Sequence, residues 1–517
     1  MTKKLKGLLR IVFGRTTFMV LSILAQVAVL AGCFLFLTEH IVYVFWVYML
    51  VGAAVVLYIL NKRETPEFKL SWIIPVLVFP VFGSLLYLFV EAQIPTRWLA
   101  RQVKRAAEEA RPYLKQDGET LERLERESAA TASLCRYMDR WGGYPVYENT
   151  SVTYFPLGED KFAELKRQLE GARRYIFLEY FIIDRGKMWD SILEILERKA
   201  KEGVEVRLMY DGMGCLTLLP HHYPEELTAR GIRCRVFSPV RPVLSTYQNN
   251  RDHRKIVVID GHTAFTGGIN LADEYINERK RFGHWKDTAV MLKGDGVKSF
   301  AAMFLQNWNM TERRREDYGP YMEASPDFCP VSAPKTGYVM PYGDSPLDEE
   351  NVGKQVYMDI LYQAKRYVHM MTPYLILDQD MISALTYAAK RGVETVIIMP
   401  HIPDKIYAYL LARSYYEELL LAGVKIYEYV PGFVHAKEYV SDDERAVVGT
   451  INMDYRSLFL HFECAAYFYR NPAVADVERD FAETLKQCEE ITLEDCRTYP
   501  GIRKLAGSLL RLIAPLM

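Results

Sequence analysis

The chain has 517 residues, half of them hydrophobic and a quarter charged. This composition excludes a disordered or low-complexity protein, and the length allows for about two to four domains. Lys and Arg total 64 against 65 Asp and Glu, a net charge of -1. Nucleic-acid-binding proteins normally carry a large basic excess, so the composition argues against nucleic acid as a partner.

The eight cysteines are scattered, and no two of them form a Cys-x-x-Cys pair. The pattern therefore predicts neither a zinc knuckle nor a disulfide framework. Reduced thiols in a cytosolic compartment are the simplest interpretation.

Three uncharged runs in the first ninety residues predict a membrane anchor over residues 1–92. They are Thr17–Leu37, Ile41–Leu60 and Ser71–Val90. Each is long enough to span a bilayer as a helix, which takes about 20 apolar residues. Buried core helices and a cleaved signal peptide are the alternatives. Three nearly contiguous runs argue against the first, and the length of the leading run argues against the second.

Basic residues precede the first run and follow both the second and the third. Because cytoplasmic loops are enriched in Lys and Arg, this pattern places the soluble part of the protein in the cytoplasm. Three full membrane spans cannot place all of these basic segments on the cytoplasmic side. Pro75, Pro80 and Gly83 interrupt the third run, which we expect to form a re-entrant or interfacial hairpin. The alternative is that one of the first two runs does not cross.

The rest of the chain contains an internal repeat. Residues 93–135 read as a helical connector, 136–330 as the first half, 331–495 as the second half and 496–517 as an amphipathic C-terminal segment. Each half has a strand-like run followed by a helix, Trp189–Glu202 or Met381–Arg391, that stops at Gly203 or Gly392. Another strand follows each glycine, and this alternation predicts an α/β sheet in each half.

The strongest repeat is a doubled motif of histidine, lysine, aspartate and asparagine. Its copies are His253, Lys255, Asp260 and Asn270 in the first half, and His435, Lys437, Asp442 and Asn452 in the second. All four residues are separated from their counterparts by the same distance along the chain, which indicates a preserved supersecondary unit.

The spacing within one copy predicts its geometry. His253 and Lys255 are two residues apart, so on a strand both side chains point to one face. Asp260-Gly261 is a hairpin-turn dipeptide, and the returning strand brings Asn270 back beside His253. Each half would thus present an imidazole, an ammonium and a carboxamide together.

Two such sets suit attack on a phosphodiester. One imidazole attacks phosphorus to form a phosphohistidine, and the other protonates the leaving alcohol and deprotonates the incoming one. The lysines and amides stabilise the charge that develops on the phosphate oxygens. This chemistry requires no metal or other cofactor, and the sequence contains no evident metal-ligand cluster or nucleotide-binding loop.

A carboxylate beside each ring would set its tautomer, and Asp287 and Glu463 are the candidates. A surface salt bridge is the alternative for Asp287. Asp260 and Asp442 lie at turns, which favours roles in holding the fold. Glu179 interrupts an apolar run and either faces the site or is a structural buried carboxylate. We expect His221, His222, His401 and His461 to be structural.

The doubled His-x-Lys-x4-Asp motif with its downstream asparagine resembles the phospholipase D superfamily. Within it, the chain is similar to bacterial cardiolipin synthases over four stretches: Trp72–Leu88, Leu178–Phe181, Gly449–Ser457 and Leu510–Met517. The third apolar run is a departure, since many relatives have two.

The resemblance implies an α/β fold with two repeated phospholipase D-like halves, one active site at their interface and transmembrane helices in front. It implies that a bacterial cell-membrane enzyme joins two phosphatidylglycerols into cardiolipin and releases glycerol. The catalytic set would be His253, Lys255, Asp260, His435, Lys437 and Asp442, with Asn270 and Asn452 on the phosphate and His253 attacking. Alternatives are a phospholipase D-type hydrolase, a transphosphatidylase with another alcohol acceptor, a nuclease and an inactive membrane scaffold.

Residues Gly501–Met517 interleave basic and apolar side chains. They predict either an amphipathic helix on an anionic bilayer surface or an ordinary packed terminal helix.

Overall fold

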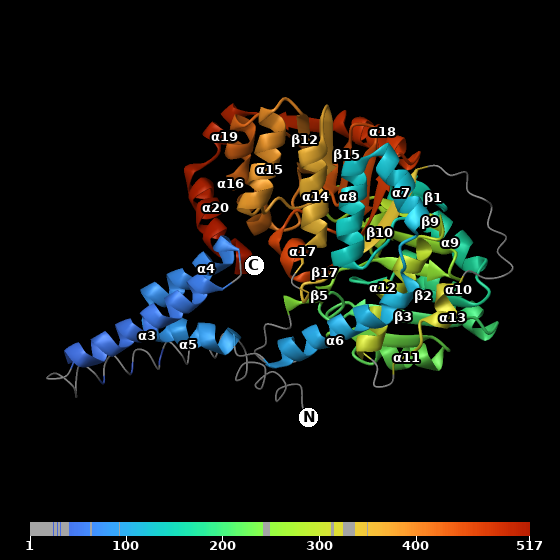
Figure 1. The fold of residues 1–517 in the computed structure, drawn as a ribbon, viewed down its shortest axis with the longest axis horizontal. Helices are drawn as coiled ribbons and strands as arrows, with labels where there is room; N and C mark the ends of the chain where they lie inside the picture. Colours follow the sequence, from blue (N-terminus) through green and yellow to red (C-terminus); the bar gives the residue numbers. More distant parts are fainter. Residues whose placement is uncertain are drawn as a thin grey trace. The chain divides into compact units, whose positions relative to one another are not determined.

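The computed structural model describes residues 24, 28, 32, 41–62, 65–91, 94–240, 249–311, 315–323, 337–348 and 350–516 (Figure 1). Two compact units emerge. One combines residues 1–99, 240–249 and 509–517, and the other combines 100–239 and 250–508. The predicted first apolar run lies almost wholly outside the described residues.

The N-terminal unit is helical. Its described helices are α3 (Ile41–Asn61), α4 (Pro66–Val78), α5 (Pro80–Glu91) and the start of α6 (Ile94–Ala110). In the part of the chain that the structure describes, no helix has both the length and the apolar character required to cross a membrane.

The third apolar run forms two helices instead of one, as its prolines predicted. The chain breaks at Phe79, and α5 folds back onto α4. A Cβ at Gly83 would lie 2.4 Å from the carbonyl oxygen of Pro75, so only glycine permits this close packing. A small core that includes Ile59, Val76 and Tyr87 joins these two helices to α3.

The larger unit begins with the predicted helical connector, which consists of α6, α7 (Gly118–Glu127) and α8 (Ala129–Tyr137). Two sheets follow. The first has the order β1-β9-β7-β6-β2-β3-β4, and the second has the order β10-β17-β16-β15-β11-β12-β13-β18. Apart from β18 at one edge, the two orders correspond strand for strand, so the sequence repeat is a repeat of the fold.

The elements of the first half are β1 (Thr150–Phe155), α9 (Gly158–Glu170), β2 (Tyr175–Tyr180), α10 (Lys187–Lys201), β3 (Glu205–Asp211), α11 (Tyr223–Ala229), β4 (Arg233–Phe237), β5 (Arg251–Asp252), β6 (Ile256–Ile259), β7 (Thr263–Gly267), β8 (His284–Lys286), β9 (Ala289–Gly294), α12 (Val297–Thr311) and α13 (Gly319–Met322). The predicted helix that stops at Gly203 is α10, and the strand after it is β3.

The elements of the second half are β10 (Tyr338–Asp344), α14 (Val352–Gln363), β11 (Tyr367–Met371), α15 (Gln379–Lys390), β12 (Glu394–Pro400), α16 (Ile406–Leu421), β13 (Lys425–Tyr429), β14 (Gly432–Val434), β15 (Glu438–Ser441), β16 (Arg445–Gly449), α17 (Tyr455–Phe459), β17 (His461–Tyr469), α18 (Ala473–Leu485), β18 (Cys488–Ile491), α19 (Leu493–Thr498) and α20 (Gly501–Ile513). The predicted helix that stops at Gly392 is α15.

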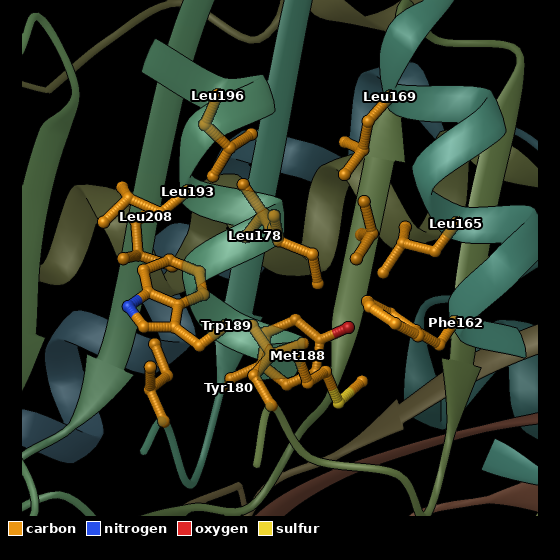
Figure 2. Close-up of a cluster of buried hydrophobic side chains, with 14 of the residues drawn as sticks. Phe162, Leu165, Leu169, Leu178, Tyr180, Met188, Trp189, Leu193, Leu196 and Leu208 are labelled. Atoms are coloured by element: carbon orange, nitrogen blue, oxygen red, sulfur yellow. The ribbon is translucent and has the colours of Figure 1, made fainter. Parts of the chain in front are cut away.

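Helices cover both faces of the first sheet, which explains why all six residues of β2 are buried. On one face, α9 and α10 form the core in Figure 2, where Trp189 packs near Leu178 and Leu208. On the other face, Phe177 of β2 stacks on Phe304 of α12, with ring centroids 4.5 Å apart. Each fully buried large side chain contributes about 1.5–3 kcal/mol. These cores fix the strands whose ends carry the polar residues of the site.

Candidate active site

The halves exchange short strands. β5 of the first half pairs with β17 of the second, and β14 of the second half pairs with β8 of the first. Residues 253–255 and 435–437 follow these exchanged strands, before the chain re-enters its own sheet at β6 or β15. The prediction that His253 and Lys255 lie on one strand is therefore wrong, because the chain leaves its own sheet there to reach the other half.

A cavity of about 520 Å³ lies where these exchanged strands meet. Both halves line it, and its walls include both motif histidines and both motif asparagines. The residues that line it include His253, Asn270, Tyr275, His435, Asn452 and His461.

His253 of the first half is held by the second half. Its backbone N–H donates to the carbonyl of Phe462 at 2.9 Å. Its ring Nδ1 lies 2.9 and 3.0 Å from the two carboxylate oxygens of Glu463, the next residue on β17. Because Nδ1 is engaged, Nε2 is the nitrogen left for chemistry.

His435 of the second half repeats the arrangement with the partners reversed. Its backbone N–H donates to the carbonyl of Lys286 at 2.7 Å, and its Nδ1 lies 2.6 Å from Oδ2 of Asp287. Asp287 and Glu463 are thus both brought to a histidine, in each case that of the opposite half.

The two carboxylates differ in their surroundings. Thr450 donates its hydroxyl to Glu463. Gly268 is the counterpart of Thr450 in the first copy of the repeat, and a Cβ there would lie 2.0 Å from Oδ1 of Asp287. Glu463 therefore gains a side-chain donor that Asp287 lacks.

Their acidities also differ. Burial alone would raise the pKa of Glu463, but the charge and hydrogen bond of His253, aided by the nearby His461, outweigh it and hold that pKa below its usual value. Burial raises the pKa of Asp287 to about 7, although Lys437 and a backbone N–H oppose the rise. Near neutral pH, Glu463 is a carboxylate, whereas the pair of His435 and Asp287 tends to retain a proton.

Burial also favours the neutral form of the basic groups. It lowers the pKa of His253 to about 3 against the opposing charge of Glu463, and it lowers the pKa of His435 well below its usual value. It lowers the pKa of Lys255 to about 8 and that of Lys437 to about 7. An anionic phosphate in the cavity would favour the charged lysines again.

Each lysine folds back on its own histidine. Lys255 Nζ donates to the carbonyl of His253 at 2.6 Å, and Lys437 donates in the same way to His435. Each ammonium group is thereby fixed at the backbone of its histidine, and neither lysine is among the residues that line the cavity.

The asparagines differ in their partners. Asn270 accepts from the backbone N–H of Ile182 at 3.0 Å and donates to the hydroxyl of Tyr275 at 2.8 Å. Oδ1 of Asn452 is buried and has no hydrogen-bond partner among the described residues.

The two motif aspartates hold the fold and are not among the residues that line the cavity. Asp260 has a φ of +52° at the predicted turn and accepts from three backbone N–H groups, those of Arg173, Arg174 and Tyr175, at 2.8–2.9 Å. Asp442 does the same for residues 365–367 at 2.8–3.1 Å. Because both carboxylates are occupied by backbone N–H groups at the turns, this geometry does not support direct contact of Asp260 or Asp442 with phosphate.

Glu179 and His461 lie differently with respect to the cavity. Glu179 is fully buried, accepts from Asn307 at 2.7 Å and does not line the cavity, so it is the structural carboxylate of the two alternatives. His461, expected to be structural, lines the cavity beside His253, with ring centroids 5.5 Å apart. Its position two residues before Glu463 on β17 was the available signal.

A family model described as "Cardiolipin synthase, PLD-like domain" matches residues 165–308 and 357–485, which are the two halves of the repeat and more than half of the chain. The chain belongs to the cardiolipin synthase family of phospholipase D-like proteins. A second model, "Phospholipase_D-nuclease N-terminal", matches residues 44–91.

Curated relatives extend over most of the chain. An uncharacterized protein of Streptococcus mutans is 51% identical and is matched over 89% of this chain and 99% of its own length. Cardiolipin synthase 2 of Bacillus cereus is 35% identical, with 88% of both chains covered. Cardiolipin synthase of Geobacillus kaustophilus is also 35% identical, with 88% of this chain and 90% of the relative covered.

Among solved structures, phosphatidylserine synthase of Haemophilus influenzae matches with a TM-score of 0.55 at 15% identity. The match covers 74% of this chain and all of that one. At this identity, the likeness supports the two-half α/β fold.

Proposed function

We propose that this chain transfers a phosphatidyl group from one phosphatidylglycerol to another, forming cardiolipin and releasing glycerol. One observation carries the proposal. Two imidazoles from opposite halves face a single cavity, and each is oriented through Nδ1 by a buried carboxylate of the other half. The names of the Bacillus and Geobacillus relatives supply the lipid product.

In the first step, the lone pair on Nε2 of His253 attacks phosphorus. The bond from phosphorus to the glycerol oxygen breaks, and the pair of His435 and Asp287 delivers a proton to that oxygen. The product is a phosphatidyl-histidine and free glycerol. Lys255, Lys437 and the two asparagines stabilise the negative charge on the phosphate oxygens.

In the second step, His435 takes the proton from the primary hydroxyl of a second phosphatidylglycerol. That oxygen attacks phosphorus, the phosphorus–nitrogen bond breaks, and its electron pair returns to His253. One phosphodiester is exchanged for another, so the reaction requires no nucleotide or other energy source.

The acidities of the two carboxylates support this division of roles. A carboxylate that stays ionised makes its histidine the better nucleophile, which favours His253 beside Glu463. A pair that retains a proton near neutral pH is the better general acid, which favours His435 beside Asp287.

We also propose that the chain is a multi-pass protein of the bacterial cell membrane with its catalytic halves in the cytoplasm. The basic flanks of the apolar runs support this orientation. Exposed apolar side chains on α3 support contact with lipid; they include Val42, Phe45, Trp46 and Leu50. Exposed apolar side chains on α20 support the amphipathic interpretation of that helix; they include Ile502, Leu505, Leu509 and Leu512.

The test is product analysis with the detergent-purified chain and phosphatidylglycerol as the only lipid, labelled in its glycerol headgroup. Cardiolipin and labelled glycerol in equal amounts are expected, and a double His253→Ala, His435→Ala variant is the blank. Phosphatidic acid with glycerol would instead identify water as the acceptor and replace the proposal by a phospholipase D-type hydrolase. Adding other alcohols then tests for a different acceptor.

A further inference from the structure

His461 lines the cavity and carries two ring nitrogens without a hydrogen bond in the described part of the chain. The side chain is 8% exposed, and neither ring nitrogen has a hydrogen-bond partner among the described residues. A buried polar group without a partner costs free energy, so such a group in the wall of a cavity indicates that a ligand completes it. The proposed transfer mechanism assigns no role to this ring.

The neighbours of His461 are two further metal-ligating side chains. Nδ1 of His461 lies 3.7 Å from Oε1 of Glu463, and Nδ1 of His253 lies 2.9 Å from the same oxygen. One ligand atom from each of the three residues lies within 4.8 Å of the other two.

The three residues converge because of the strand exchange. His461 and Glu463 are two apart on β17, so their side chains share a face, and β5 delivers His253 to that face from the first half. The sequence pattern does not reveal the cluster, because His253 lies far before its partners along the chain, in the other half.

Two imidazole nitrogens and one carboxylate oxygen form a donor set typical of zinc sites with an open fourth position. Metal–ligand bonds of about 2.1 Å require ligand atoms about 3.4 Å apart in tetrahedral geometry. The observed separations of 2.9 and 3.7 Å bracket that value, so small side-chain rotations would admit an ion.

We propose that His253, Glu463 and His461 bind a divalent transition-metal ion, with Zn²⁺ the best match, and that the bound ion inhibits the enzyme. The inhibition rests on the proposed function, whereas the binding does not.

Inhibition follows from the position of the ion. A cation on Nδ1 of His253 would replace the hydrogen bond to Glu463 and move the proton of the neutral ring from Nδ1 to Nε2, so Nε2 would have no lone pair with which to attack phosphorus. It would also neutralise the carboxylate that stabilises the positive charge on the attacking ring. The open coordination position would face the cavity that the substrate phosphate must enter.

The binding test uses the full chain in detergent, stripped of metal and titrated with Zn²⁺ against a chromophoric chelator. His461→Asn removes one ligand and keeps a polar side chain of similar size. His369→Asn is the matched control, because His369 also pairs with a glutamate, Glu478 at 3.0 Å, outside the cavity. Thermal unfolding of each variant confirms that it is folded.

We expect one Zn²⁺ per chain, an affinity reduced roughly tenfold or more in His461→Asn, and an unchanged affinity in His369→Asn. Equal affinity in the wild-type protein and His461→Asn, or no binding at all, would overturn the site.

The inhibition test measures cardiolipin formation against free Zn²⁺, each variant normalised to its own metal-free rate. The concentration for half-inhibition should rise by the same factor as the dissociation constant in His461→Asn. Zinc that binds without slowing the wild-type protein would overturn the inhibitory role. A chain that binds zinc but makes no cardiolipin in metal-free buffer would mark a failure of the proposed function, with the binding result intact.

Discussion

Glu463 of the second half and His253 of the first half form one buried pair, with Oε1 of the carboxylate 2.9 Å from Nδ1 of the ring. The mirror pair of Asp287 and His435 is closer, at 2.6 Å. Neither half therefore supplies both members of either motif pair. Both halves are needed to orient either ring.

Glu463→Gln should reduce the rate of cardiolipin formation by about 10²–10⁴-fold, because a neutral amide no longer fixes the tautomer of His253 or stabilises its positive charge. The rate with saturating phosphatidylglycerol checks this prediction. Glu478→Gln, which alters the non-catalytic pair with His369, is the control and should retain its rate. Comparable losses in both variants would indicate a general effect on folding.

Much of this site follows from the sequence, for physical reasons. The constant offset between the two copies at four polar positions predicts two superimposable units, and the two sheets have matching strand orders. Glu463 and Asp287 were predicted as orienting groups because each imidazole needs a carboxylate to set its tautomer.

The other features of the site depend on contacts between the halves that the spacing of residues along the chain does not reveal. β5 has two residues and β14 has three, too few for periodicity to reveal that they leave their own sheet. The assignment of Glu463 to His253, and the arrival of His461 in the cavity, both depend on that exchange. The different environments of Glu463 and Asp287 depend on Thr450 against Gly268, a difference whose meaning appears only in three dimensions.

The lowered pKa of Lys437 predicts how the rate of cardiolipin formation depends on pH. Burial lowers its pKa to about 7, although Asp287 opposes this, so in the free enzyme the ammonium is lost as the pH rises through 7. The second-order constant kcat/KM should therefore fall above about pH 7. The anionic phosphate of bound substrate restores the charge, so kcat should fall only at higher pH.

Initial rates between pH 6 and 9 at low and saturating substrate separate the two constants. Lys437→Arg, whose charge does not titrate in this range, should show a smaller alkaline decline even if its maximal rate is lower, and the decline that remains comes from the proton of the pair of His435 and Asp287, whose pKa is also about 7. A decline of the same size in Lys437→Arg and the wild-type protein would contradict the role of Lys437.

Asp260 should matter for stability more than for chemistry. Asp260→Ala removes the acceptor of three backbone hydrogen bonds and should lower the free energy of unfolding by about 2–4 kcal/mol. Asp260→Asn keeps Oδ1 and tolerates the positive φ, so it should cost about 1 kcal/mol.

Thermal or denaturant unfolding of the two variants measures these differences, and turnover is normalised to the folded fraction. Turnover per folded molecule should stay within a few-fold of wild type in Asp260→Asn. If turnover per folded molecule fell several hundred-fold in a stably folded variant, Asp260 would instead take part in catalysis.

Removal of metal should not reduce the rate. The transfer steps use nitrogen, oxygen and ammonium groups of the chain itself, so EDTA should leave cardiolipin formation unchanged, or raise it where Zn²⁺ occupies the proposed site. Rates before and after dialysis against EDTA check this outcome. Inhibition by EDTA that a divalent ion reverses would require a different mechanism.

The two histidines should be distinguishable with an activated substrate. A phosphatidyl ester of p-nitrophenol has a leaving group that needs no protonation, so the first step then requires the nucleophile but not the general acid. His435→Asn should release about one equivalent of p-nitrophenol per chain in a burst and then stall, because His435 no longer activates the acceptor. His253→Asn should release none. The reverse pattern would assign the attack to His435, and steady release by either variant would show that the transfer does not need both rings.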